Sequence, residues 1–436
     1  MELLAVFIAF AACMAAALIF DITMLLPLAV GFVLFVGLSL HRGYSLRQVM
    51  GFAKGSLKES FIVVGILLLI GCLTGMWRLS GTVAYFVTLG VSAIPPRVFI
   101  LSAFLLSAIM AYALGTSFGV TATAGVILMS IARAGGVDPI LAAGAVMSGV
   151  YVGDRGSPAA SSANLVSVLT HTDMRKNVRE MLKCSIVPFA ICCIIYALLS
   201  IRAPMESTDT GVINMLGEEF ELVWYCLIPA VLMLVLPFCG MSIKLSMAVS
   251  LLSSVAVAVF AQHADFSTCL KAMVTGYEAK NAELSPMLAG GGIVSMLEIC
   301  GILTISCSYG GIFENTGLLA PINDRIARAS EKIGRFPVML LLGAAVSALF
   351  CNQTVGTIMQ SNLSAELYGA DENGDKMIDM ENSVILEAAL VPWCIASSVP
   401  LAMMGVGSRT LFLAFYLWLV PIWWLIRRKT KKPEHI

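Results

Sequence analysis

Asp154 is the residue of this sequence that is best placed to do chemistry. It lies well inside the apolar segment 139–170, between Gly153 and Gly156. A carboxylate at membrane depth costs several kcal/mol unless it is paired or binds a cation. A bound Na⁺ or a proton removes that cost, and exchanging one for the other is the chemistry of an antiporter. The alternative is a structural ion pair between Asp154 and the adjacent Arg155.

Hydroxyl and amide side chains follow Asp154 closely. Ser157 and Ser161 are four residues apart and share a helix face if the chain after Pro158 is a regular helix. Such oxygens are hard ligands that suit a hard cation, so the sequence predicts a Na⁺ site with Asp154 and Ser157 as metal ligands. The alternative is a packing contact between helices. The candidate residues of this cluster are Asp154, Ser157, Ser161, Ser162 and Asn164.

Two interrupted apolar segments supply further candidates. Segment 98–132 is interrupted by Gly-Thr-Ser-Phe-Gly at 115–119, and segment 336–368 by Cys-Asn-Gln-Thr-Val-Gly at 351–356. Such interruptions indicate broken helices or re-entrant hairpins, because non-helical backbone at that depth must be satisfied by protein or a watery cavity. Free helix ends direct N–H groups at anions and carbonyls at cations. The candidates at the two tips are Thr116, Ser117, Asn352, Gln353 and Thr354.

Three carboxylates of the second half deserve comparison as additional ligands. Glu387 lies within an apolar run and is a candidate second ionisable ligand, whereas Glu381 is expected at the membrane surface. Glu298 also lies in an apolar run, where a functional and a structural role are equally compatible with the pattern. All histidines fall in loops or in the tail, so none is a candidate proton relay; they are His41, His171, His263 and His435.

The elements that position these residues must be membrane helices. Of the 436 residues, 59% are hydrophobic and 12% charged, and the mean hydropathy is +0.91. A soluble domain carries roughly 25% charged residues. The net charge of zero provides no basic surface for nucleic acid. The twelve cysteines have neither zinc-site nor disulfide spacing. We expect no cofactor apart from Na⁺ or H⁺ as coupling ion, and membrane lipid as the surroundings.

The predicted architecture is therefore an all-α polytopic membrane protein. Apolar stretches of about 20 residues, the length that crosses a bilayer, recur along the chain. Segments 78–96 and 314–334 have mixed polarity and are predicted to be interfacial arm helices. The predicted continuous spans are 3–20, 22–40, 61–76, 184–201, 222–239, 245–261, 286–307 and 411–426, and the interrupted ones are 98–132, 139–170, 336–368 and 383–405.

The distribution of charge predicts the orientation. Basic clusters occur in 41–58, 171–183, 325–335 and 427–432, and the loop 206–221 is acidic. Basic loops remain in the cytoplasm, so we expect an inner-membrane protein with both termini cytoplasmic. If segments 98–132 and 336–368 are hairpins that return to their own side of the membrane, all four basic clusters lie in the cytoplasm. The acidic loop 370–381 would then also be cytoplasmic, which is the one conflict.

The two halves resemble each other. Gly75 and Gly81 recur as Gly311 and Gly317, and the interruption at 115–119 recurs at 352–356 with nearly the same offset. Segment 44–59 before the first repeat is expected in the cytoplasm, and its counterpart 266–283 outside. The repeats are therefore inverted, which places a substrate site at their interface. The expected parts are N-terminal helices with a cytoplasmic loop (1–60), a first repeat (61–201), linking and scaffold helices (202–285), a second repeat (286–426) and a basic tail (427–436).

Several short motifs lie within residues 115–182: Gly-Thr-Ser at 115–117, Gly-Asp-Arg-Gly-Ser-Pro at 153–158, Asn-Leu at 164–165 and Thr-Asp at 172–173. In this combination they resemble the NhaC-type sodium/proton antiporter family, and Pro392-Trp393 is a weaker second match. The resemblance implies, through the wider ion transporter superfamily, re-entrant hairpins, arm helices, a homodimer and elevator-type movement.

This chain departs from that family at three positions. Ser161 stands where many members have an acidic residue, and Asn382 and Cys394 stand where Asp and Asn are frequent. The favoured function is sodium(cation)/proton antiport with Asp154 as the exchanging carboxylate, and not an enzymatic one. Fewer carboxylates leave fewer groups that could exchange Na⁺ for H⁺, which argues against strict antiport. The alternative function is a Na⁺- or H⁺-coupled carrier or exchanger of a small organic solute, a carboxylate or an amino acid. An intramembrane hydrolase is disfavoured because no embedded histidine could activate Ser148.

Overall fold

The structure is a computed structural model of the chain, and it describes residues 2–20, 22–205, 210–281, 284–316 and 323–430. Within these ranges the regular structure is helical apart from one antiparallel bridge between Tyr277 and Gly290. The expected counterpart of Gly81, Gly317, lies outside the described residues. The same holds for the rest of 317–322 in the second arm segment and for 431–436 of the tail.

The N-terminal half contains a bent helix pair, a helical hairpin and an interrupted helix. The bend lies between α3 and α4, whose axes differ by 67°, and the predicted arm segment 78–96 contains α4. The hairpin consists of α5 and the α6–α7 helix, and the interrupted helix of α8 and α9. The elements are α1 (Glu2–Ile19), α2 (Leu25–His41), α3 (Leu46–Leu79), α4 (Thr82–Ala93), η1 (Pro96–Val98), α5 (Phe99–Leu114), α6 (Ser117–Val120), the π-helical η2 (Thr121–Gly125), α7 (Val126–Ala134), α8 (Pro139–Gly156), α9 (Ser161–Leu169) and α10 (Met174–Arg202).

The C-terminal half contains a second hairpin, α18 and α19, and a second interrupted helix, α20 to α22. Linking helices separate the halves. The elements are α11 (Thr210–Glu219), η3 (Trp224–Leu227), α12 (Ile228–Phe238), α13 (Ile243–Phe260), α14 (Phe266–Val274), α15 (Ser285–Leu288), η4 (Ile293–Met296), α16 (Leu297–Thr316), α17 (Asn323–Ile333), α18 (Arg335–Phe350), α19 (Gln353–Leu363), η6 (Ala365–Leu367), η7 (Ala370–Glu372), α20 (Asn373–Glu381), α21 (Val384–Glu387), α22 (Ile395–Met404), η8 (Ser408–Leu413) and α23 (Phe415–Thr430).

The lengths and compositions of these helices confirm the predicted class. Among the described residues, five helices are long and apolar enough to cross a membrane, and the bent α3–α4 pair would make a sixth. Further apolar helices are shorter, among them α2, α18 and α22. The chain is therefore an all-helical, multi-pass membrane protein. The five long spans are Pro96–Leu114, Ser117–Ala134, Met174–Arg202, Ile243–Phe260 and Ile293–Phe313.

The predicted continuous span 286–307 is wrong in its first part. The short helix α15 ends at Leu288, and the three glycines 290–292 all have positive φ. They allow the chain to meet the backbone of α3, where the N–H of Gly292 donates to the carbonyl of Gly71 at 2.8 Å. A Cβ on Gly71 would lie 2.6 Å from the Gly292 oxygen, so only glycine fits this approach. The long helix α16 begins only at Leu297.

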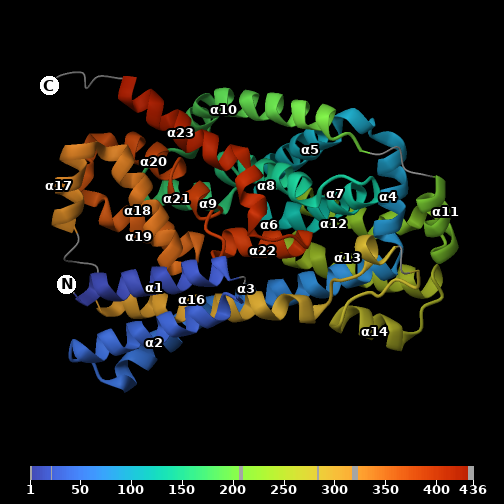
Figure 1. Cartoon of the computed structure of the whole chain (residues 1–436), viewed down its shortest axis with the longest axis horizontal. Coiled ribbons are helices and arrows are strands. Elements are labelled where there is room, and N and C mark those ends of the chain that lie inside the picture. Colours follow the sequence, from blue (N-terminus) through green and yellow to red (C-terminus); the bar gives the residue numbers. More distant parts are fainter. Residues whose placement is uncertain (1, 21, 206–209, 282–283, 317–322, 431–436) are drawn as a thin grey trace.

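The helices form two sides with the interruptions between them. In Figure 1, α1, α2, α3 and α16 run along the lower side, and α5, α10 and α23 along the upper side. The lower helices contact each other, since α16 packs against both α2 and α3. The hairpin helix α6 and the short helices α9, α21 and α22 lie in the middle. The interrupted segments therefore meet in the interior, as their polar sequence requires.

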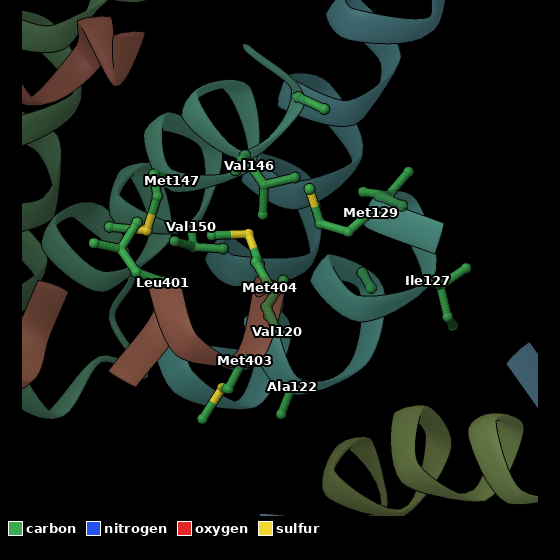
Figure 2. Packing of buried hydrophobic residues seen from close by; sticks show 14 of the residues in the cluster. Val120, Ala122, Ile127, Met129, Val146, Met147, Val150, Leu401, Met403 and Met404 are labelled. Atoms are coloured by element: carbon green, nitrogen blue, oxygen red, sulfur yellow. The ribbon is translucent and has the colours of Figure 1, made fainter. Parts of the chain in front are cut away.

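Apolar side chains connect the two halves next to these interruptions. Figure 2 shows α22 of the second half inserted among α6, η2, α7 and α8 of the first half. This cluster is buried and closely packed, so it holds α22 beside the first hairpin. Its labelled residues are Val120, Ala122, Ile127, Met129, Val146, Met147, Val150, Leu401, Met403 and Met404.

Candidate ion-binding site

The first hairpin turns at the predicted interruption. Helix α5 ends at Leu114, and Gly115 adopts the left-handed conformation with φ +65°. A Cβ on Gly115 would lie 2.4 Å from the carbonyl carbon of Ala159, so the tip contacts the backbone break that follows Asp154. Thr116 then caps the next helix, because its Oγ1 accepts a hydrogen bond from the Gly119 N–H at 3.2 Å.

The second hairpin turns with almost the same backbone. Cys351 has φ +53°, and Asn352 follows with φ −138° and ψ +121°, close to the −146° and +121° of Thr116. The Asn352 Oδ1 accepts hydrogen bonds from the N–H groups of Thr354 and Val355 at 2.9 and 3.4 Å. The carbonyl of Cys351 accepts from the Ile395 N–H at 2.9 Å, so this tip also contacts the start of a half-helix.

Asp154 lies where the two tips meet. The Ser117 hydroxyl donates to its Oδ1 at 3.2 Å, and the Gln353 Nε2 donates to its Oδ2 at 3.2 Å. Ser117 and Gln353 are the first residues of α6 and α19, directly after the two caps. Gln353 also donates to the carbonyl of Ile385 at 2.9 Å. Asp154 is 5% exposed, so its carboxyl group is surrounded almost entirely by protein groups.

The residues after Asp154 organise the helix break. Helix α8 ends at Gly156 and α9 begins at Ser161. The Ser162 hydroxyl donates to the backbone carbonyl of Asp154, and the Ser157 Oγ accepts from the Ala159 N–H at 3.1 Å. Asn164 bridges the break, since its Nδ2 donates to the carbonyls of Pro158 and Ala160 at 3.1 and 2.7 Å.

The structure therefore brings together only part of the predicted cluster. Ser117, Ser162 and Gln353 are hydrogen-bonded to Asp154, and Ser157, three residues further along the chain, is buried with its hydroxyl on the Ala159 N–H. Ser161 and Asn164 are exposed, as is Thr354 at the second tip. The π-helical turn η2 follows Ser117, and π-turns in helices are frequent at functional positions.

The structural ion pair between Asp154 and Arg155 is not found. Within the described part of the chain, Arg155 forms no ion pair. Its guanidinium is completely buried and donates instead to neutral groups. The acceptors are the carbonyls of Met181 and Glu381, the side-chain oxygens of Ser185, Asn382 and Tyr416, and the Cys184 sulfur.

The expected surface position of Glu381 is wrong. Its side chain is completely buried, and neither carboxylate oxygen has a hydrogen-bond partner. Glu381 ends α20, a helix that contacts α9, α10 and α18 and is therefore covered on several sides. The mixed sequence Met-Ile-Asp-Met-Glu-Asn at 377–382 gave no apolar signal for this burial.

The other two candidate carboxylates, Glu387 and Glu298, have different surroundings from Asp154. The Oε2 of Glu387 is buried without a hydrogen-bond partner against Gly343, where an added Cβ would lie 2.2 Å from it. Glu298 is exposed and accepts a hydrogen bond from Thr23. It lines a cavity of about 460 Å³ that also reaches Pro392 and Ser398. Neither residue is hydrogen-bonded to the group around Asp154.

The donor set limits what this site could hold. Among the described residues, no three His, Cys, Asp or Glu side chains are grouped so as to hold a metal ion. A cation next to Asp154 would be bound by one carboxylate with hydroxyl, amide and carbonyl oxygens. These are the hard ligands of alkali cations, not the softer ligands of transition metals.

The chain has several helices long enough to span a bilayer, and one buried carboxylate lies between two helix tips. This is the organisation of a membrane transport protein. The profile of the Na⁺/H⁺ antiporter family matches residues 3–163 and 149–424, and the chain belongs to this family. The predicted NhaC-type resemblance is thereby confirmed, and transport by antiport is the activity of the class.

Relatives with assigned substrates differ in what they exchange. The chain is 28% identical to the malate-2H⁺/Na⁺-lactate antiporter of Bacillus subtilis, over 92% of this chain and 89% of that protein. It is 26% identical to the Na⁺/H⁺ antiporter NhaC of Alkalihalophilus pseudofirmus, over 84% of this chain and 81% of the relative. It is also 26% identical to the arginine/ornithine antiporter ArcD of Halobacterium salinarum, over 80% and 75%.

Proposed function

We propose that this chain is a Na⁺/H⁺ antiporter in which Asp154 binds Na⁺ and H⁺ alternately. The observation that carries the proposal is the convergence of Ser117 and Gln353, one from each hairpin tip, on the two oxygens of a buried carboxylate. Two neutral donors only partly replace the hydration of a carboxylate. The remaining cost is removed when a cation or a proton binds.

The same side chains suit both bound states. The Ser117 hydroxyl carries a donor and two acceptor lone pairs, and the Gln353 amide carries both a donor and an acceptor end. With Na⁺ bound, the hydroxyl oxygen and the amide oxygen serve as ligands beside Asp154. With H⁺ bound, the carboxyl group donates to one of these acceptors. Ser157 lies close enough in the chain to contribute a further oxygen.

The two tips also suggest how the site changes sides. We propose that they belong to inverted repeats, with elevator-type movement of the part that carries Asp154 and a homodimeric assembly. The matched backbone of 115–116 and 351–352 supports the repeat. Both termini lie in the cytoplasm of a bacterial inner-membrane protein in this scheme, because the basic clusters then remain inside.

A second candidate function is coupled exchange of a small organic solute. The specific observation in its favour is that two of the compared relatives carry names with organic substrates, malate and lactate in one and arginine and ornithine in the other. In this alternative Asp154 holds the coupling ion, and the free N–H groups of the tips bind the carboxylate of the solute.

The test is Asp154→Asn in proteoliposomes that report Na⁺-driven pH change. We expect the rate to fall about 100-fold or more, since each loss of about 1.4 kcal/mol in ion binding is a factor of ten. Asp371→Asn, at an exposed carboxylate, is the matched control and retains wild-type activity. Wild-type transport by the Asp154 variant would exclude this site.

The same proteoliposomes separate the two functions. A Na⁺/H⁺ antiporter acidifies or alkalinises the lumen with Na⁺ as the only added solute. A solute exchanger responds only when a carboxylate or amino acid is supplied on the opposite side. No response to Na⁺ alone in wild-type protein, with a response to such solutes, would favour the second function.

A further inference from the structure

Arg78 is a buried cation whose hydrogen-bonding capacity is mostly unused. It lies in the last turn of α3, directly before the bend to α4, and is 6% exposed. Its Nη1 donates to the Thr74 carbonyl at 2.9 Å, and its Nε is buried without a hydrogen-bond partner. No described group accepts from its Nη2. A guanidinium remains protonated in proteins, so a full charge is buried here with one of its three nitrogens bonded.

A second arginine adds to the positive charge. Arg133 lies in the last turn of α7 and is half-buried. Its Nη2 donates to the carbonyls of Met404 and Gly405, at 2.6 and 3.2 Å, where α22 ends. Burial and the Arg133 charge both act against the charge of Arg78. The two guanidiniums are therefore close enough to repel each other, and the helix C-termini beside them supply only partial negative charge.

No carboxylate offsets these charges in the part of the chain that the structure describes. Neither arginine belongs to any of the ion pairs found there. Arg78 lies at the opposite end of α3 from the basic segment 41–58. In the proposed orientation that end faces outward, whereas loops rich in Lys and Arg stay in the cytoplasm. Because an unpaired buried charge is strongly destabilising, this position favours a ligand that supplies the missing negative charge.

The unused donors define the shape of this ligand. The N–H bonds of Nε and Nη2 point in parallel along one edge of a guanidinium, and this edge binds both oxygens of a carboxylate. In Arg78 the Thr74 carbonyl occupies Nη1, so the two-donor edge is the one left open. A halide lacks the two oxygens that match it. A side chain that is 6% exposed is reached by a small anion and not by a lipid headgroup.

We infer that Arg78 binds a small free carboxylate through its open Nε–Nη2 edge, and that Arg133 strengthens this binding as a second positive charge. The site is separate from Asp154 and goes beyond the proposed function, because neither arginine is hydrogen-bonded to a hairpin tip. Arg133 holds the far end of α22, whose first N–H, from Ile395, donates to the Cys351 carbonyl. Occupancy of the site therefore stabilises the folded protein independently of ion transport.

The test is the Tm of the purified full-length protein in detergent, measured in sodium chloride and in sodium acetate at the same pH and Na⁺ concentration. We expect acetate to raise the Tm of wild type saturably by about 2–4 °C, the scale of a ligand at roughly ten times its Kd. Arg78→Met replaces the two-donor edge by an apolar side chain and abolishes the acetate shift. Arg97→Gln, at an exposed arginine of η1, is the matched control and keeps the shift.

Two further variants separate charge from shape. Arg78→Lys keeps the positive charge without the two-donor edge, and we expect half of the Tm shift to require at least about tenfold more acetate, the loss of one charge-assisted hydrogen bond. Arg133→Gln keeps the edge and removes the second charge. We expect it to raise the half-saturating acetate concentration roughly 3- to 10-fold, the scale of one unit charge at several ångströms in a high effective dielectric.

Three results would overturn the inference. The first is the same Tm for wild type in chloride and acetate, which is also the result if a carboxylate of the chain outside the described residues fills the site. The second is an undiminished acetate shift in Arg78→Met; if this variant does not fold, an undiminished shift and half-saturation in Arg78→Lys decide in the same way. The third is a shift produced by phosphatidylglycerol micelles and not by acetate, which would assign the site to a lipid headgroup.

This test is independent of the proposed function. The Na⁺ concentration is constant and the readout is stability, so Asp154→Asn keeps the acetate shift whatever its transport activity. A missing acetate shift together with loss of transport in Asp154→Asn removes only the carboxylate site. A normal acetate shift together with full transport in Asp154→Asn removes only the proposed ion site.

Discussion

The two helix breaks at the centre of the molecule share a backbone and differ in chemistry. Thr116 and Asn352 are separated by 236 positions, the same offset as Gly75 and Gly311. At that offset Asp154 corresponds to position 390 (154 + 236), which is a leucine. The turn, the cap and the contact with a half-helix occur in both halves, whereas a carboxylate at this position occurs in the first half only. The second half contributes a donor, Gln353, to a site whose charge belongs to the first.

The tips themselves differ at the left-handed residue. The first half has Gly115, with no space for a side chain against Ala159 and Ala160. The second half has Cys351 at φ +53°, a conformation that side chains rarely adopt. The second tip therefore accommodates a side chain at the left-handed residue, and the first tip does not.

Gly115→Ala is expected to have the largest effect on this comparison. The new Cβ would meet the Ala159 carbonyl carbon at 2.4 Å and adopt a conformation that costs about 1–2 kcal/mol for non-glycine residues. Moving the break displaces Asp154, so we expect a more than tenfold loss of transport and a lower Tm in detergent. Gly156→Ala, where no atom lies within 4 Å of the new Cβ, is the control. Equal stability and activity of the two variants would contradict the close contact.

The two donors to Asp154 provide the next test, which addresses whether both halves contribute to the site. Ser117→Ala and Gln353→Ala each remove one hydrogen bond to a charged group, an interaction worth about 1.5–3 kcal/mol. We expect each to change the KM for Na⁺ about 10- to 100-fold. Thr354→Ala, at the exposed neighbour, should leave it unchanged. An effect of Ser117→Ala alone would mean that the second half does not contribute to the site.

Cys351→Gly should have the smallest effect. Glycine relieves the left-handed strain at φ +53°, worth about 1–2 kcal/mol. It loses about 0.5–1 kcal/mol through the greater freedom of the unfolded chain, so the net change in stability is small. We expect transport within a factor of two of wild type and nearly the same Tm. A loss comparable to that of Gly115→Ala would show that the Cys351 side chain, and not only the turn, is needed.

The sequence predicts the turns well because they are local. Glycine and polar residues inside apolar segments mark the interruptions at 115–119, 153–158 and 351–356, and the structure turns at each of them. Asp154, Ser117 and Gln353 were all identified as candidates for the same reason. The first part of the span 286–307 could also have been recognised as irregular, since Gly290 to Gly292 interrupt it.

What the sequence did not predict depends on distant contacts. Glu381 is expected at the membrane surface from the sequence, and its burial comes from helices that join α20 from elsewhere in the chain. Arg155 was expected to pair with Asp154 if with anything, whereas its acceptors Ser185, Asn382 and Tyr416 lie in other helices. The exposure of Ser161 and Asn164 likewise depends on how α9 packs, and helical spacing alone does not determine it.

The distance along the chain between Asp154 and Gln353 has a consequence for biosynthesis. The two residues are 199 positions apart. At a synthesis rate of about 5–20 residues per second, Gln353 emerges from the ribosome roughly 10–40 s after Asp154. During that interval the nascent chain has a carboxylate in the bilayer with only the Ser117 half of its final partners. Insertion of the first half must therefore proceed with Asp154 protonated or still in contact with water, and the proposed ion site is completed only after the second hairpin has been inserted.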